Sequence, residues 1–283
     1  MKTIESRYDA SAAAYRTWWE PVLAPTARDL LDRLERAAGP PVGRVVDVGT
    51  GAGLLAIESV RRWPGVEVSG LDGSGEMLAV AVATARSALE PGARQRVNWL
   101  RGHAERMPFE DASLDLVLSS FAYQLVPRLS VALGEAFRVL RPGGRLAFVT
   151  WRIADVRFAP DDAFEDALDE LEPSDEPGDV EEARAGDLTS AEAAAARLRR
   201  IGFRSVIARE AWLSHDYEPA TYVDFLEGYA ERELFAELEP ARRARLRERT
   251  NELLARLPAS AFRWHVPVVH ALAVRPESIE RRP

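Results

Sequence analysis

The 283-residue chain contains no cysteine, and its only lysine is Lys2. Without cysteine it can form no disulfide, thiolate nucleophile or cysteine-ligated zinc site, which fits a cytoplasmic protein. No apolar run reaches the roughly 18 residues of a membrane span, and the first residues lack the apolar stretch of a secretion signal. The net charge of −8 provides no basic surface for a nucleic-acid backbone. We therefore expect neither a membrane span nor a nucleic-acid partner.

Short apolar runs alternate with helical patterns through the first half of the chain. This alternation predicts an α/β fold with right-handed crossovers and a doubly wound, mostly parallel, Rossmann-like sheet. Two further runs bring the expected number of strands to seven, and residues 141–144 read as a turn before the fifth strand. Strands are expected at 45–48, 66–71, 97–100, 114–119, 145–150, 203–213 and 261–274, and helices at 54–63, 75–89, 130–140, 189–200 and over most of 219–257.

Residues 45–53, Val-Val-Asp-Val-Gly-Thr-Gly-Ala-Gly, are the most informative segment. They read as a buried strand, a glycine-rich turn and the start of a helix near Leu54. Glycines let the backbone approach a ligand closely, and the helix adds free N–H groups and the positive end of its dipole. The segment lacks the third glycine of a dinucleotide fingerprint and the lysine of a phosphate loop. An acid at Asp47 suits a ligand with a cationic amino end, although an ordinary strand-to-helix turn is the alternative.

This Asp-x-Gly-x-Gly-x-Gly pattern resembles the first motif of class I S-adenosylmethionine-dependent methyltransferases. Residues 70–78, Gly-Leu-Asp-Gly-Ser-Gly-Glu-Met-Leu, resemble the second motif, and 102–109, Gly-His-Ala-Glu-Arg-Met-Pro-Phe, resemble the third. The resemblance covers residues 8–151 closely and 189–274 more loosely. It points to the branch that contains ubiquinone/menaquinone C-methyltransferases and natural-product methyltransferases. It implies S-adenosylmethionine as cofactor and a small organic acceptor, apolar or aromatic, methylated at O, N or C.

The resemblance also implies a set of cofactor-binding residues. Asp72 ends the second strand, where it would accept hydrogen bonds from both ribose hydroxyls, and Met77 would cover the adenine. His103 stands where the family usually has the aspartate that receives the adenine amino group. A neutral imidazole nitrogen can accept that bond, but a loop histidine facing water is the alternative. The expected set is Tyr15, Asp47, Gly49, Thr50, Gly51, Gly53, Asp72, Gly73, Ser74, Met77, His103, Ala104, Glu105, Ser119 and Phe121.

The reaction implied by the resemblance needs little from the protein beyond alignment and exclusion of water, because a sulfonium methyl group is already activated. A general base is needed only when the acceptor holds its proton near neutral pH. Candidates are His265, His270 and Tyr123, each of which is also explained as a structural residue. No acidic cluster resembles the magnesium site of catechol-type O-methyltransferases, so we expect no metal.

The expected organisation is an N-terminal helical lid over 1–40 and a cofactor-binding core over 41–151. A helical insertion follows over 152–188, and the rest of the core over 189–283 carries a second insertion at 214–258. We expect these helical segments to cap the carboxyl edge of the sheet. Two other functions stay open: a cofactor-binding protein without methyl transfer, such as a cyclase or regulatory module, and an NAD(P)-dependent oxidoreductase.

Overall fold

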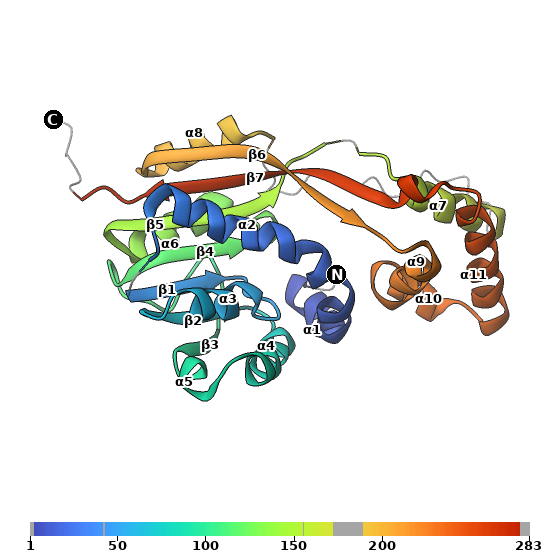
Figure 1. Ribbon diagram of the computed structural model, residues 1–283, viewed down its shortest axis with the longest axis horizontal. Helices are drawn as coiled ribbons and strands as arrows, with labels where there is room; N and C mark the ends of the chain where they lie inside the picture. The colour runs from blue at the N-terminus through green and yellow to red at the C-terminus, as the bar shows by residue number, and fades with distance from the viewer. Residues whose placement is uncertain (1–2, 42, 155, 172–188, 278–283) are drawn as a thin grey trace. The chain divides into compact units, whose positions relative to one another are not determined.

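The computed structural model describes residues 3–41, 43–154, 156–171 and 189–277, which include seven strands in one sheet. The strand order is β3-β2-β1-β4-β5-β7-β6 (Figure 1). Strands β1 to β5 are parallel, whereas β7 runs antiparallel to β5. The predicted doubly wound, mostly parallel, seven-stranded sheet is therefore confirmed. The strands are β1 (Gly43–Val48), β2 (Val66–Asp72), β3 (Val97–Arg101), β4 (Leu114–Ser120), β5 (Leu140–Trp151), β6 (Arg204–Asp216) and β7 (Arg263–Val274).

The chain divides into two compact units. Unit 1 comprises Met1–Ile153, Ala183–Ala211 and Pro267–Pro283, and unit 2 comprises Ala154–Glu182 and Trp212–Val266. Unit 1 holds β1 to β5 and the larger parts of β6 and β7. Unit 2 takes in most of the two segments expected as helical insertions, although residues 155 and 172–188 of the first lie outside the described part of the chain. The placement of these segments as a cap stays a prediction.

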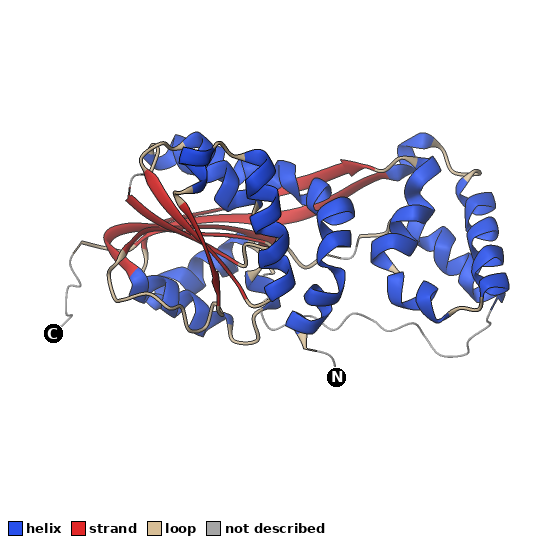
Figure 2. Cartoon of the chain, turned by 90° about the horizontal axis from the view of Figure 1, so that it is seen from below, coloured by secondary structure: helices blue, strands red, loops and turns tan. Residues whose placement is uncertain are grey.

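Unit 1 carries helices on both faces of its sheet (Figure 2). Alternation along β7 separates the two layers: Val269 and Ala271 belong to the core beneath α6 and α8, whereas His270 faces α2. Among the described residues, no helix is both long and apolar enough to cross a membrane. The helices of unit 1 are α1 (Ile4–Ala14), the π-helix η1 (Tyr15–Trp19), α2 (Glu20–Ala38), α3 (Leu54–Arg62), α4 (Gly75–Ala88), α5 (Pro91–Arg94), the short η2 (Tyr123–Leu125), α6 (Leu129–Val139) and α8 (Ala191–Ile201).

Helix α2 is positioned by a stripe of apolar side chains on one side. Leu23, Ala27, Leu30 and Leu34 recur every three or four residues, which places them on one face, and all four are buried. Burying one leucine contributes roughly 1.5–3 kcal/mol, so this stripe holds α2 firmly against the sheet. The N-terminal end of α2 is thereby fixed beside the carboxyl edge of β1.

The turn expected at residues 141–144 lies inside a strand. β5 already pairs with β4 at Leu140, and the register then skips from Leu140 to Arg145, so the four residues between them form a bulge. Gly143 has φ of +78°, a left-handed conformation that lets the extra residues loop out of the ladder. The expected start of this strand at 145 was therefore wrong.

Unit 2 is a helical unit with an aromatic core. Neighbouring rings in this core have centroids less than 6 Å apart; they belong to Phe158, Tyr217, Tyr222 and Phe225. The Tyr222 hydroxyl donates a hydrogen bond to Asp161. The helical region expected over most of 219–257 is divided into several helices, the last of which, α11, begins at Pro240. The helices of unit 2 are α7 (Ala159–Leu171), η3 (Pro219–Thr221), α9 (Tyr222–Phe225), η4 (Leu226–Ala230), α10 (Arg232–Glu237), α11 (Pro240–Leu254) and η5 (Ala259–Phe262).

Candidate active site

The glycine-rich turn after β1 has the geometry that only glycine adopts readily. Gly49, Gly51 and Gly53 have φ of +67°, +55° and +91°. A Cβ on Gly49 would lie 2.2 Å from the Ala122 Cβ, and one on Gly53 would lie 2.8 Å from the Trp99 ring. The turn is therefore both left-handed and tightly packed, and its backbone leads directly into α3.

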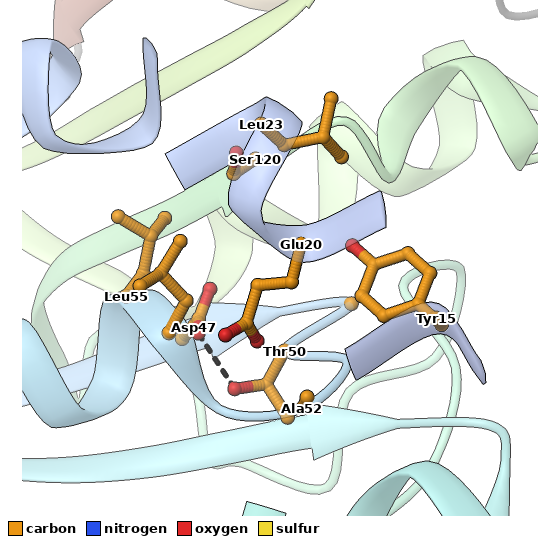
Figure 3. Close-up of a pocket in the computed structure, with 10 residues that line it drawn as sticks. Tyr15, Glu20, Leu23, Asp47, Thr50, Ala52, Leu55 and Ser120 are labelled. Atoms are coloured by element: carbon orange, nitrogen blue, oxygen red, sulfur yellow. Dashed lines mark hydrogen bonds between the residues drawn. The ribbon is translucent and has the colours of Figure 1, made fainter. Parts of the chain in front are cut away.

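Asp47 lies at the base of this turn and is almost completely buried. Its Oδ2 accepts a hydrogen bond from the Thr50 hydroxyl at 2.6 Å (Figure 3). It also accepts one from the Ala56 N–H at 3.2 Å. Burial raises the pKa of the Asp47 carboxyl to about 7, despite these two hydrogen bonds. Asp47 ties the end of β1 to the first turn of α3, and its ionisation is sensitive to a nearby positive charge.

A pocket opens beside the turn and contains a second carboxylate, that of Glu20. Glu20 is only 6% exposed, and its Oε2 has no hydrogen-bond partner among the residues the structure describes. Burial raises the pKa of Glu20, while Arg16, whose guanidinium lies 2.7 Å from Oε1, lowers it. Figure 3 shows the Glu20 carboxyl directed toward Asp47 and Thr50. The pocket is lined by Tyr15, Glu20, Leu23, Asp47, Gly49, Thr50, Ala52, Leu54, Leu55 and Ser120.

Sequence reasoning missed Glu20, although a signal was present. Glu20 stands three residues before Leu23 and seven before Ala27, so it continues the buried stripe of α2 toward the N-terminus. A carboxylate on a buried helix face is unusual because desolvation disfavours its charge. That position was enough to select Glu20 as a candidate ligand-binding residue.

Asp72 connects the glycine turn to the loop after β2. One carboxylate oxygen accepts from the Gly51 N–H at 2.8 Å and the other from the Ser74 N–H at 2.9 Å. Burial raises the pKa of Asp72, and the backbone hydrogen bonds oppose that rise. Each oxygen keeps a lone pair that could accept a further hydrogen bond. The position at the carboxyl edge, beside the glycine turn, is the one expected for a ribose-binding acid.

The N-terminal segment contacts the same loops. Ser74 donates to Asp9 of α1 at 2.5 Å, and its hydroxyl also caps α4 by accepting from the Met77 N–H. A Cβ on Gly73 would lie 3.0 Å from the Glu5 side chain, and one on Gly51 would lie 3.7 Å from the Tyr15 ring. Helix α1 and the π-helix η1 thus lie over the loops that follow β1 and β2.

The loop after β3 is more open. The His103 side chain is 62% exposed, and its Nδ1 lies 3.6 Å from a carboxylate oxygen of Glu5. Ala104 is half-buried, and Glu105 forms an ion pair with Arg128 at 2.9 Å. His103 therefore faces both α1 and solvent, so a ligand that contacts it would lie next to α1.

The remaining expected binding residues occupy different environments. Ser119 is fully buried and donates to the Val48 carbonyl at 2.9 Å, and Met77 is fully buried, so neither lines the pocket. Phe121 has φ of +51°, which is strained for a residue with a bulky side chain. Its ring lies 4.3 Å from that of Trp151. Strain of this kind directly after a strand is common near functional sites.

Two of the three candidate bases lie away from the pocket. Tyr123 is completely buried against Phe148, which raises the pKa of its phenol, and its hydroxyl has no partner among the described residues. His270 faces α2, where its Nε2 lies 3.5 Å from Asp29, and burial lowers its pKa to about 4. Neither side chain lines the pocket beside the glycine turn.

The third candidate base, His265, belongs to unit 2. Its Nδ1 lies 2.5 Å from the Ser214 hydroxyl, and its ring stacks on Trp212 at 4.3 Å with an interplanar angle of 9°. These contacts hold the imidazole in one orientation. His265 belongs to unit 2, whereas His270 belongs to unit 1.

Comparison with known proteins agrees with the resemblance inferred from the motifs. Residues 46–148 match the family described as a methyltransferase domain. The malonyl-[acyl-carrier protein] O-methyltransferase of Methylococcus capsulatus is 36% identical over 155 residues, which are 54% of this chain and 51% of that protein. The ubiquinone/menaquinone biosynthesis C-methyltransferase of Dinoroseobacter shibae is 35% identical over 151 residues, 50% of this chain and 54% of that protein. The chain therefore spans about half the length of the curated relatives it matches.

A solved structure has the same fold at lower sequence identity. The phosphoethanolamine N-methyltransferase 2 of Haemonchus contortus superposes with a TM-score of 0.57 and 19% identity over 98% of this chain and 61% of that one. The match over residues 46–148 and the similarity to named methyltransferases confirm the resemblance inferred from the motifs.

Proposed function

We propose that this protein binds S-adenosylmethionine at the pocket beside residues 49–53 and transfers its methyl group to a small organic molecule. One observation carries the proposal: the glycine turn of a methyltransferase domain borders a pocket that holds two buried carboxylates, Asp47 and Glu20. Buried carboxylates favour a cationic ligand group, because burial has removed most of their solvation. The phosphates of a nicotinamide dinucleotide would be repelled by the same pair.

The site residues divide according to the two ends of the ligand. Asp47 and Glu20 would hold the amino-acid end, where an ammonium group lies. Asp72 would accept hydrogen bonds from the ribose hydroxyls, and Gly49 and Gly51 would let the backbone approach the ligand. Tyr15, Gly53, Gly73, Ser74, Met77, His103, Ala104, Glu105, Ser119 and Phe121 complete the set proposed from the sequence. Helix α1 lies over part of this set, which supports its proposed role as a lid.

An aromatic cluster supports an apolar or aromatic acceptor. Trp19, Phe121 and Trp151 meet at the carboxyl ends of β4 and β5, with ring separations of 4.3 Å and 6.5 Å from Trp151. Phe121 directly follows Ser120, which lines the pocket. Flat apolar side chains offer a matching surface to such a molecule. Relatives named for ubiquinone and menaquinone biosynthesis favour the same class of acceptor.

The protein's contribution to the reaction is mainly alignment and exclusion of water. S-adenosylmethionine supplies an electrophilic methyl group when bound. The two carboxylates and Asp72 would fix its ends, while Leu23 and Tyr15 would restrict access of solvent to the pocket. Of the candidate bases, neither Tyr123 nor His270 lines this pocket.

The proposed function can be tested by titrating the purified chain with S-adenosylmethionine, S-adenosylhomocysteine and NADH in a calorimeter. We expect binding of the first two and none of NADH. Transfer of a labelled methyl group is then measured with a panel of phenols, amines and hydroquinones. Binding without turnover of any acceptor would favour a non-methylating role, and binding of NADH alone would overturn the proposal.

Replacing Glu20 with glutamine should weaken S-adenosylmethionine binding by about 1–2 kcal/mol, roughly five- to thirtyfold, because a charged hydrogen-bond acceptor becomes neutral. The folded protein without ligand should be at least as stable as the wild type, since a buried charge has been removed. Calorimetry and urea unfolding measure the two effects separately. Equal affinity in Glu20→Gln would exclude Glu20 from ligand binding.

Replacing His103 with aspartate restores the residue that the family usually has at this position. Affinity for S-adenosylmethionine should be retained or improved once repulsion from the nearby Glu5 is removed by Glu5→Gln in the same chain. The Glu5→Gln single variant is the control, and fluorescence titration measures all three proteins. A large loss of affinity in the double variant would show that His103 has a specific role of its own.

We also propose a cytoplasmic location and the absence of a nucleic-acid partner. The lack of cysteine and the net charge of −8 support both. In unit 2, two arginines of α11 are paired with carboxylates, Arg247 with Asp224 and Arg249 with Glu170, which leaves these two less suited to binding phosphates. A filter-binding assay with RNA and DNA at low salt should detect no retained complex.

A further inference from the structure

A second pocket of unit 1 lies at the other end of α2. It has a volume of about 220 Å³ and is bordered by α2, β6 and β7. Arg33 and Arg36 project from the last two turns of α2, and Arg209 comes from β6 (elements labelled in Figure 1). The full lining is Arg33, Arg36, Ala37, Ile207, Arg209, His270 and Leu272.

The charges around this pocket do not balance. Asp29 does not line the pocket, but its carboxylate lies 2.6 Å from the Arg33 Nε and 3.5 Å from an Arg36 nitrogen. Arg209 forms no ion pair with any residue in the described part of the chain. Burial keeps His270 neutral, with its pKa lowered to about 4. Among the described residues, three guanidinium groups and the carboxylate of Asp29 therefore leave two positive charges without a partner charge.

His270 supplies the second, independent observation. It is 1% exposed, yet neither ring nitrogen has a hydrogen-bond partner among the described residues, and the Nε2 lies 3.5 Å from Asp29 without a hydrogen bond. A buried polar group without a partner is costly and rare in folded proteins. The ring lines the pocket, so a ligand bound there could supply the missing partner.

We infer that this pocket is a binding site for a phosphate group, held by Arg33, Arg36 and Arg209 and hydrogen-bonded by His270. A phosphate monoester carries close to two negative charges near neutral pH, which matches the charge the pocket lacks. Guanidinium groups bind phosphate oxygens through paired N–H donors, and a neutral imidazole adds one further donor. The volume leaves room for atoms beyond the phosphate itself.

This site is separate from the pocket beside the glycine turn. Glu20 and Arg36 lie at opposite ends of α2, so the rise of an α-helix places them roughly 24 Å apart. The inferred ligand therefore does not share the pocket of the proposed methyl donor, and the inference holds whether or not the protein transfers methyl groups. The phosphate could belong to a free metabolite or to a phospholipid headgroup.

The experiment measures phosphate binding by the full chain in two ways. Pyrophosphate is titrated in a calorimeter, and co-sedimentation is measured with phosphatidylcholine vesicles with and without phosphatidic acid. We expect saturable binding that is weakened at least about tenfold in the double variant Arg36→Ala/Arg209→Ala. The matched control is Arg199→Ala/Arg200→Ala, which removes the same charge from exposed positions on α8 and should bind like the wild type.

The outcomes separate the sources and can overturn the inference. If the protein binds pyrophosphate but does not sediment with the vesicles, the ligand is a free phosphorylated molecule. If it sediments with phosphatidic acid vesicles but does not bind pyrophosphate, the ligand is a lipid headgroup. The inferred site would be overturned if the protein bound neither pyrophosphate nor the vesicles, or if the control variant Arg199→Ala/Arg200→Ala lost as much affinity as Arg36→Ala/Arg209→Ala. His270→Phe should also lose affinity for pyrophosphate or for the vesicles. If that variant does not fold, the comparison of Arg36→Ala/Arg209→Ala with its control decides the test.

Discussion

Replacing Asp72 with alanine should weaken S-adenosylmethionine binding by about 2–3 kcal/mol, roughly 30- to 150-fold, because two hydrogen bonds to the ribose hydroxyls are lost together. The structure adds a second reason for a large effect. The carboxylate also accepts from the backbone N–H groups of Gly51 and Ser74, so the alanine removes two restraints from the binding loops. Isothermal titration calorimetry on the folded variant measures the loss.

Two companion variants separate ligand contacts from general damage. Asp72→Asn keeps the size of the side chain and one acceptor oxygen, so its affinity should fall between those of the wild type and the alanine variant. Asp115 accepts from the Arg44 N–H at the other end of the parallel strands, and Asp115→Asn should leave affinity unchanged. Full affinity in Asp72→Ala would remove Asp72 from the site.

The second large effect concerns pH. Because burial raises the pKa of Asp47 to about 7, this carboxyl is mostly protonated in the ligand-free protein below that pH. Binding of a cationic ligand favours the ionised form, so the protein must release a proton to bind. Affinity for S-adenosylmethionine should therefore rise up to about tenfold per pH unit between about pH 5 and 7. Titrations in buffers of different ionisation enthalpy also report the released proton, and a flat profile would contradict the assignment.

The same group predicts how stability changes with pH in the absence of ligand. The folded-state pKa of Asp47 is raised from 3.8 to about 7, so its contribution to stability is present below pH 4 and is lost as pH rises through 7. The loss is bounded by roughly 4 kcal/mol, since one pKa unit corresponds to about 1.4 kcal/mol. Urea unfolding of Asp47→Asn should lack this decline. An identical pH dependence in wild type and variant would show that Asp47 is ionised at little cost.

Much of the fold could be predicted because its signals are local. The glycines that follow β1 have left-handed backbones, and Gly49 has no space for a Cβ. Because other residues adopt this conformation rarely, the spacing of the glycines marks the turn in the sequence. Asp72 at the end of β2 could be assigned to the same edge of the sheet, because the carboxyl ends of parallel strands meet there. The start of β5 was misplaced because a bulge and a turn share the same Pro-Gly-Gly residues.

The sequence by itself determined the alternation of strands and helices, the glycine turn and the acids that end β1 and β2, because periodicity and glycine geometry act over a few residues. Only the tertiary structure decided which distant side chains share a pocket. Glu20 joins Asp47 there across 26 intervening residues, whereas His270 and Tyr123 are buried elsewhere. Burial and partners depend on long-range packing, so the residue types suited to a role far outnumber those that the fold places to perform it.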